Sequence, residues 1–215
     1  MRYPPGHKEE VRARLVKAAS HALRRDGLEG ISIPALMKKA GLTHGGFYAH
    51  FAGKDEVVAA AVRAAADETA ARVFGGGAVG EPRAAPIARV LGAYCSSEHA
   101  QRPGEGCVVA ALGAEGRRTT GPVKKAFAYA ARGLVQLVER SLQASPPLDA
   151  SPASSSTDGP MSARRTDSPT VSDEALDVAV RMVGAVVLAR LVDDDVLRDR
   201  LLAIGRLPPA PPTIP

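Results

Sequence analysis

The sequence predicts an all-α protein in which an N-terminal three-helix, helix-turn-helix head is joined to a larger helical body. Apolar residues recur every three or four positions through most of the chain, which is the period of an amphipathic helix. No convincing stretch shows the alternation typical of a half-buried strand. The 215 residues, of which 45% are hydrophobic, suffice for one or two domains with an apolar core.

The head begins with a helix predicted over residues 11–23, where apolar side chains at 11, 15, 18, 19, 22 and 23 form one stripe. Asp26 and Gly27 are a stop signal for this helix. Ser32 is placed to cap a second, short helix, and Pro34 falls in its first turn, where a missing N–H costs nothing. Gly41 ends the second helix.

A third short helix is predicted over residues 44–51, and the hydroxyl of Thr43 is expected to cap it. Two short helices joined by a tight glycine turn make a helix-turn-helix. Phe47 and Phe51 lie four positions apart, so we expect both to face inward as the core of the head. Tyr48 falls on the outer side.

The body is predicted to start with an alanine-rich helix over residues 54–74, because two acids in its first turn suit the helix dipole and three glycines follow it. Residues 145–170 hold seven Ser and five Pro but only two large apolar residues, so we predict a disordered loop there. The other helices of the body are expected over residues 87–97, 107–115, 122–143, 172–192 and 195–204.

Positive charge is concentrated in the head. Residues 1–54 contain ten Lys and Arg against four acids, a net charge of +6, whereas the rest of the chain has a net charge of −1. This asymmetry indicates a head that binds a polyanion and a body that does not. The alternative is a basic face that is merely solvated.

Several classes of protein are excluded by what the sequence lacks. Cys95 and Cys107 are too few for a disulfide framework and form no zinc-ligand pattern with His99, so we expect no metal and no cofactor. No apolar run reaches the roughly 18 to 20 residues needed to span a bilayer, and the N-terminus lacks the apolar stretch of a secretory signal, so we expect a cytoplasmic protein with no membrane contact. The motifs GxxxxGK[ST], HExxH and GxSxG are absent, which argues against an enzyme.

The stretch ISIPALMKKAGLTHGGFYAHFAGKDEVV, residues 31–58, strongly resembles the DNA-binding head of the tetracycline-repressor-like (TetR/AcrR-type) family of bacterial transcription regulators. The resemblance covers roughly residues 10–60 in detail, and its most specific part is the run GLTHGGFYAHF followed by Lys54. Met37 is a departure, since many relatives carry a small residue there. The resemblance implies a DNA-binding domain over residues 1–54 and an effector-binding and dimerisation domain over residues 55–215.

The physics of a recognition helix assigns roles to the same residues, because its first residues meet base edges while flanking groups bind phosphates. Tyr48 is placed for a phosphate, and Lys54 resembles the phosphate-binding lysine of the family. The adjacent glycines Gly45 and Gly46 each cost about 1 kcal/mol in helix propensity relative to alanine. We expect a close approach of the backbone to DNA to compensate for this cost. The alternative is that the two glycines only loosen the turn. Arg2 and Arg12 are candidates for outlying phosphate contacts. The predicted DNA-binding residues are Thr43, His44, Gly45, Gly46, Tyr48, His50 and Lys54.

The resemblance also implies a homodimer whose last two long helices form a four-helix bundle, so that two recognition helices meet a palindromic double-stranded operator. A monomer that buries the apolar helix internally is the alternative. A small-molecule effector would bind within the body and lower operator affinity, repression being the usual mode of the family. Candidate lining residues are Tyr94, Cys107, Phe127, Tyr129 and Met182, although apolar residues at helical spacing are commonly plain core.

Cys107 suggests a second reading. The segment 94–115 resembles a subset of these regulators, some of which sense electrophiles or oxidants through a cysteine, and a helix N-terminus favours the reactive thiolate. Alternatively, Cys107 is a small buried apolar residue. Three functions therefore stay open: a ligand-responsive repressor, a thiol-based repressor acting through Cys107, and a helical small-molecule binder without a role on DNA.

Overall fold

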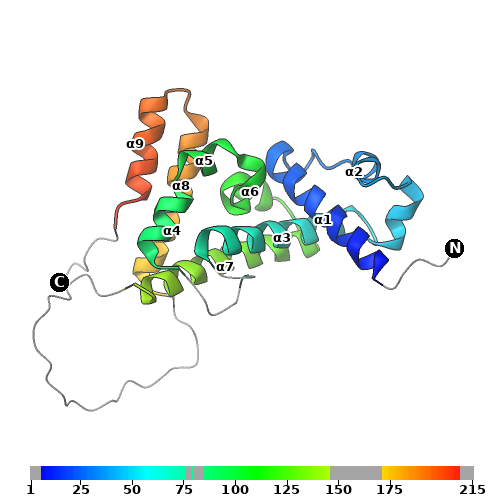
Figure 1. Cartoon of the computed structure of the whole chain (residues 1–215), viewed down its shortest axis with the longest axis horizontal. Helices are drawn as coiled ribbons and strands as arrows, with labels where there is room; N and C mark the ends of the chain where they lie inside the picture. Colours follow the sequence, from blue (N-terminus) through cyan, green and yellow to red (C-terminus); the bar gives the residue numbers. More distant parts are fainter. Residues whose placement is uncertain (1–5, 76–78, 80–84, 146–170, 209–215) are drawn as a thin grey trace, which may run out of the picture.

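The computed structural model describes residues 6–75, 79, 85–145 and 171–208, and every structural statement below refers to these residues. All regular secondary structure among them is helical (Figure 1). The predicted all-α class is therefore confirmed. None of the helices in these ranges is long and apolar enough to cross a membrane.

The head starts with α1 (His7–Asp26) and α2 (Ile33–Lys39), which end where the sequence predicts. Gly27 and Gly41 have φ angles of 80° and 71°, a conformation that residues with a Cβ rarely adopt, so each glycine allows the chain to leave its helix. The Ser32 hydroxyl accepts a hydrogen bond from the Ala35 N–H at 3.5 Å, which confirms the predicted cap.

A short helix is present where the third one is predicted, but it ends two residues earlier, and the predicted cap by Thr43 is wrong. The structure has a six-residue 3₁₀ helix, η1 (His44–Ala49), and the Thr43 side chain makes no capping hydrogen bond. Two consecutive glycines at the start disfavour an α-helix, and a 3₁₀ turn is a common form for so short a piece. The chain then turns at Phe47, whose carbonyl accepts hydrogen bonds from the N–H groups of His50 and Phe51.

The body continues from α3 (Lys54–Phe74), whose bounds agree with the predicted 54–74. The single helix predicted over 87–97 is wrong, because Ser96 accepts a hydrogen bond from the His99 N–H and starts a separate short helix. Of the loop predicted over 145–170, all but Ser145 lies outside the described residues. The remaining elements are α4 (Ile87–Tyr94), α5 (Ser97–Gln101), η2 (Pro103–Glu105), α6 (Val108–Gly116), α7 (Gly121–Gln143), α8 (Asp173–Leu191) and α9 (Asp195–Gly205).

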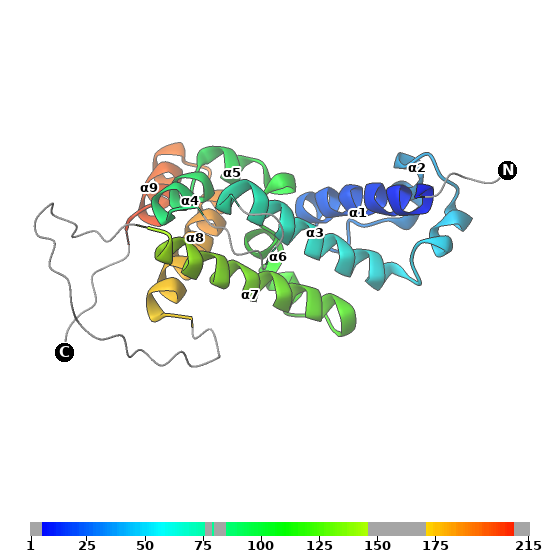
Figure 2. The same cartoon turned by 60° about the horizontal axis from the view of Figure 1, so that its bottom comes forward.

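Helix α3 connects the head to the body. It lies beside α7 along the long axis, with α1 and α2 at one end and α8 and α9 at the other (Figures 1 and 2). Its first half packs into the core of the head and its last residues pack into the core of the body. A boundary at residue 54 therefore stays a prediction, because α3 begins there and belongs to both cores.

Helix α1 is joined to the body by a buried arginine. The Arg24 guanidinium donates to the Gly106 carbonyl at 3.0 Å and forms an ion pair with Glu68 of α3 at 2.5 Å. At the other end of α6, the Glu115 carboxylate accepts a hydrogen bond from the Leu28 N–H at 2.9 Å. Both ends of the α6 segment are thus attached to the chain of the head.

Candidate nucleic-acid interface

The outer end of the head presents η1 and the flanking ends of α2 and α3. Phe47 and Phe51 are buried with their ring centroids 5.5 Å apart, so they anchor this segment to the head. Tyr48 packs edge-on against Phe47 and is 65% exposed. The predicted inward and outward orientations of these three aromatic residues are confirmed.

The two glycines of η1 have different surroundings. A Cβ at Gly45 would have no atom within 4 Å, whereas a Cβ at Gly46 would lie 3.6 Å from Met37 Cε and 3.7 Å from Thr43 Oγ1. Packing inside the protein therefore does not require glycine at position 45. Any requirement for glycine at that position has to come from a surface that approaches from outside.

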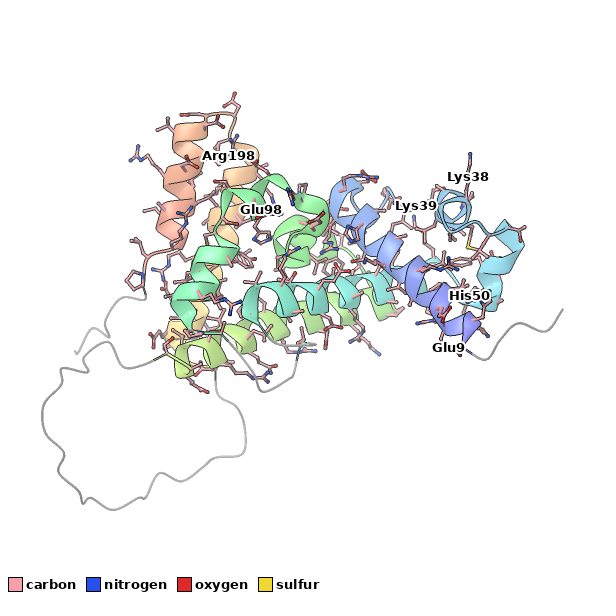
Figure 3. The ribbon with its side chains drawn as sticks, in the orientation of Figure 1. Glu9, Lys38, Lys39, His50, Glu98 and Arg198 are labelled. Atoms are coloured by element: carbon pink, nitrogen blue, oxygen red, sulfur yellow. The ribbon has the colours of Figure 1, made fainter. Side chains whose placement is uncertain are left out.

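Exposed lysines lie on the two helices that precede and follow η1 in the chain. Lys38 and Lys39 of α2 and Lys54 at the start of α3 are exposed, and Figure 3 shows Lys38, Lys39 and His50 at the end of the molecule away from α8 and α9. Lys54 follows Gly53, so it lies at a helix N-terminus, where free N–H groups attract anions. The surface around η1 is therefore suited to phosphate groups.

The histidines of the predicted interface differ in what can be said of them. His44 begins η1, but its side chain lies outside the described part of the structure, so its role stays a prediction. His50 is half-buried, and burial together with the nearby positive charges of Lys8, Arg12 and His7 lowers its pKa below the ordinary 6.5. The His50 ring is therefore uncharged at neutral pH.

The junction between η1 and α3 is held by two charged side chains whose pairing the sequence does not indicate. Arg12 of α1 donates through Nε to the His50 carbonyl at 3.4 Å and through Nη2 to Glu56 Oε1 at 3.1 Å. The second carboxylate oxygen of Glu56 accepts from the Ala52 N–H at 2.7 Å. Arg12 and Glu56 are 44 residues apart, and no spacing in the sequence indicates the pair.

The five residues predicted to line a ligand cavity lie at different places in the described part of the structure. Tyr94 and Met182 are fully buried in the core of the body, and Phe127 lies against α6, where a Cβ at Gly116 would be 2.7 Å from its ring. Tyr129 donates to Asp67 Oδ1 at 2.9 Å, which ties α7 to α3. These side chains hold helices together.

Of the five, Cys107 alone is among the side chains lining a small apolar pocket between α3, α6 and α7. The pocket has a volume of about 10 Å³, which is room for no more than one water molecule. Its other lining residues are Ala66, Thr69, Ala70, Phe74, Val79, Val108, Val109, Ala130, Leu134 and Leu137. A small molecule could enter only if α6 or its neighbours moved.

The two cysteines are free and buried. Cys107 is only 3% exposed and caps the start of α6, where its N–H donates to His99 Nε2 at 2.8 Å. Burial raises the pKa of Cys95 to about 11, so that thiol is protonated at neutral pH. The described structure therefore does not favour a thiol switch. It also contains, within the described ranges, no group of three side chains suited to a metal ion.

Comparisons with known proteins agree with the architecture of the head. Residues 15–61 match the sequence profile described as "Bacterial regulatory proteins, tetR family". No curated protein matches the chain. The match covers α2, η1 and the start of α3, which are the elements that form the candidate interface.

Several solved structures are similar to this chain over the body as well as the head. The reduced form of NemR from E. coli is 20% identical, covers 95% of this chain and 100% of its own, and has a TM-score of 0.64. A TetR transcriptional regulator from Chloroflexus aurantiacus J-10-FL is 21% identical over 93% of each chain, with a TM-score of 0.62. AibR in complex with isovaleryl coenzyme A and operator DNA is 14% identical over 93% of this chain and 100% of its own, with a TM-score of 0.54. At these identities the likeness shows a common fold.

Proposed function

We propose that this chain, a DNA-binding transcriptional regulator of the TetR type, binds a palindromic operator as a homodimer and leaves it when a small-molecule effector binds. We further propose that the protein acts as a repressor in the cytoplasm and catalyses no reaction. The observation that carries the proposal is η1, which is anchored by two buried phenylalanines, presents Tyr48 outward and is flanked by exposed lysines.

On DNA, the first residues of η1 would meet base edges in the major groove, and the groups around them would bind phosphates. Thr43, His44, Gly45 and Gly46 are assigned to the bases. Tyr48, His50 and Lys54 are assigned to phosphates. The open space around Gly45 supports a close approach of backbone to DNA, because nothing within the head explains a glycine there.

An apolar stripe on α8 and α9 supports the homodimer. Leu176, Val180 and Leu188 are exposed and spaced by multiples of four, so they share one face of α8. Gly184 lies in the same stripe, with open space where a Cβ would be, which would let a second helix come close. Exposed apolar patches of this kind mark protein interfaces. The other exposed large apolar residues in this part of the chain are Leu191 on α8, Val196, Leu197 and Ile204 on α9, and Leu207 just beyond α9.

The attachments of α6 support an effector response. A ligand that enlarged the apolar pocket beside Cys107 would displace α6, and α6 is tied to the head through Arg24 and Glu115. Tyr94 is fully buried, and its burial together with the neighbouring Cys107 thiol raises the pKa of its hydroxyl. An uncharged, largely apolar effector with one polar atom would suit these surroundings. The complex of AibR with isovaleryl coenzyme A and operator DNA indicates that this fold can hold both kinds of ligand.

Selection of bound duplexes from a random pool tests the proposal. We expect enrichment of an inverted repeat with half-sites about one helical turn apart, and binding that weakens steeply from about 50 to 200 mM salt. A screen of small molecules for release of the enriched duplex would then identify the effector. Failure to enrich any duplex at low salt would contradict the proposal.

A further inference from the structure

We infer that Arg12 and Glu56 form a clamp that sets the position of η1 on DNA, so that the negatively charged Glu56 strengthens operator binding. The inference rests on the proposed function, because it assigns a role in the same interface. In this arrangement neither residue contacts DNA, so for Arg12 the clamp is an alternative to the phosphate contact expected from the sequence. Both are positioning residues that act through the backbone between η1 and α3.

The clamp contacts three of the four residues that join η1 to α3. Arg12 holds the carbonyl of His50, and its guanidinium carbon lies 4.7 Å from the centre of the Phe51 ring. Glu56 holds the N–H of Ala52 and is itself held by Arg12. Each of the three consecutive residues thus contacts a side chain that comes from α1 or from the first turn of α3.

Helix η1 needs such support because it has little rigidity of its own. It is a six-residue 3₁₀ helix, a form with poorer hydrogen-bond geometry than an α-helix, and its first half contains two glycines. The capping bond from Thr43 is absent. Its C-terminal end is therefore the end at which the protein fixes its direction, through Phe47, Phe51 and the clamp.

A simple electrostatic view predicts the opposite effect of Glu56. A carboxylate on the phosphate-facing side of a head repels DNA, and its removal would raise affinity. The Glu56 side chain is 45% exposed, so its charge is available to oppose phosphates. The hydrogen bond from the Ala52 N–H, followed by that from Arg12, lowers its pKa, so it is ionised at neutral pH. The two views therefore differ in the sign of one measurable change.

Asp55 provides a matched control. It is the neighbouring acid in the first turn of α3, it is exposed, and no side-chain contact is recorded for it among the described residues. We expect Glu56→Gln to weaken binding to the selected operator about five- to tenfold, the scale of one charge-assisted hydrogen bond. Asp55→Asn should leave affinity unchanged or raise it. An operator affinity equal to or higher than that of the wild-type protein for both variants would overturn the inference.

Arg12 gives an independent test through the salt dependence of binding. Loss of a phosphate contact lowers the slope of log K against log salt by about 1. We expect Arg12→Gln to weaken operator binding with an unchanged slope, and Arg14→Gln, a change at an exposed arginine two residues away on α1, to serve as its control. A reduced slope for Arg12→Gln would show a direct phosphate contact and overturn the inference.

The double variant completes the experiment. If the pair is one clamp, Arg12→Gln/Glu56→Gln should lose less binding free energy than the sum of the two single losses, because both single changes already remove the Arg12–Glu56 ion pair. Independent, additive effects would contradict the clamp. Full-length protein is used throughout, and binding of each variant to a scrambled duplex reports a folded head. Wild-type protein that binds no duplex would refute the proposed function itself, whereas wild-type binding with Glu56→Gln unaffected refutes only the clamp.

Discussion

Acidification should destabilise the protein through His99, a buried histidine held in its neutral form. Its Nδ1 lies 2.5 Å from the Tyr94 carbonyl and therefore carries the proton, while Nε2 accepts the Cys107 N–H. Burial lowers the pKa of His99 from 6.5 to about 4, and the positive charges of Arg190, Arg72 and Arg24 act in the same direction. Protonation of Nε2 would also break its bond to Cys107.

The size of the effect follows from the two pKa values. Because the unfolded chain binds the proton first, stability is unaffected above pH 6.5, falls as the pH drops from 6.5 to 4, and loses nothing more from this group below 4. The loss of unfolding free energy is about 1.4 kcal/mol at pH 5.5 and about 2.6 kcal/mol at pH 4.5.

Urea unfolding at pH 8, 5.5 and 4.5 measures this loss. Carboxylates also titrate in this range, so the quantity of interest is the difference between wild-type protein and His99→Gln, whose side chain does not titrate. We expect the wild-type curve to fall more steeply with decreasing pH by about the amounts above. Parallel curves for the two proteins would refute the assignment of His99 as a neutral buried link.

Three further predictions concern DNA and the dimer. Gly45→Ala should leave the melting temperature nearly unchanged, because a Cβ at this position has open space around it. The same change should weaken operator binding at least tenfold in a gel-shift titration. Unchanged binding would contradict the proposal that the backbone at Gly45 lies close to DNA. Lys54→Ala should weaken operator and scrambled duplexes alike and lower the salt slope by about 1, and an unchanged slope would exclude a phosphate contact. Val180→Glu, at a side chain that is 73% exposed, should shift the protein from dimer to monomer in sedimentation while keeping its helical circular dichroism spectrum; a dimer that persists would place the interface elsewhere.

Local signals in the sequence predicted most of the helices. The hydroxyls of Ser32 and Ser172 cap α2 and α8 as such residues do, and the ends of α1 and α2 follow from glycines with positive φ. The four-residue spacing of Phe47 and Phe51 predicted their burial even though the helix between them is of another type. Signals that act within a turn or two are visible in a single sequence.

Contacts between distant segments could not be predicted in this way. The bond from Arg24 to Gly106 spans 82 residues, and the pair of Arg12 and Glu56 spans 44, so neither leaves a periodic mark. The same limit applies to the ligand candidates. Helical spacing predicts that Tyr94 and Met182 are buried, but whether a buried side chain borders a cavity depends on how the helices pack against one another.

The central claim is that the outer end of the head reads duplex DNA, and the ratio of two dissociation constants tests it most directly. Fluorescence anisotropy of full-length protein would compare the selected inverted repeat with a scrambled duplex of the same composition at about 150 mM salt. The account predicts that the selected duplex binds at least about a thousandfold more tightly. Equal affinity for the two duplexes would contradict it.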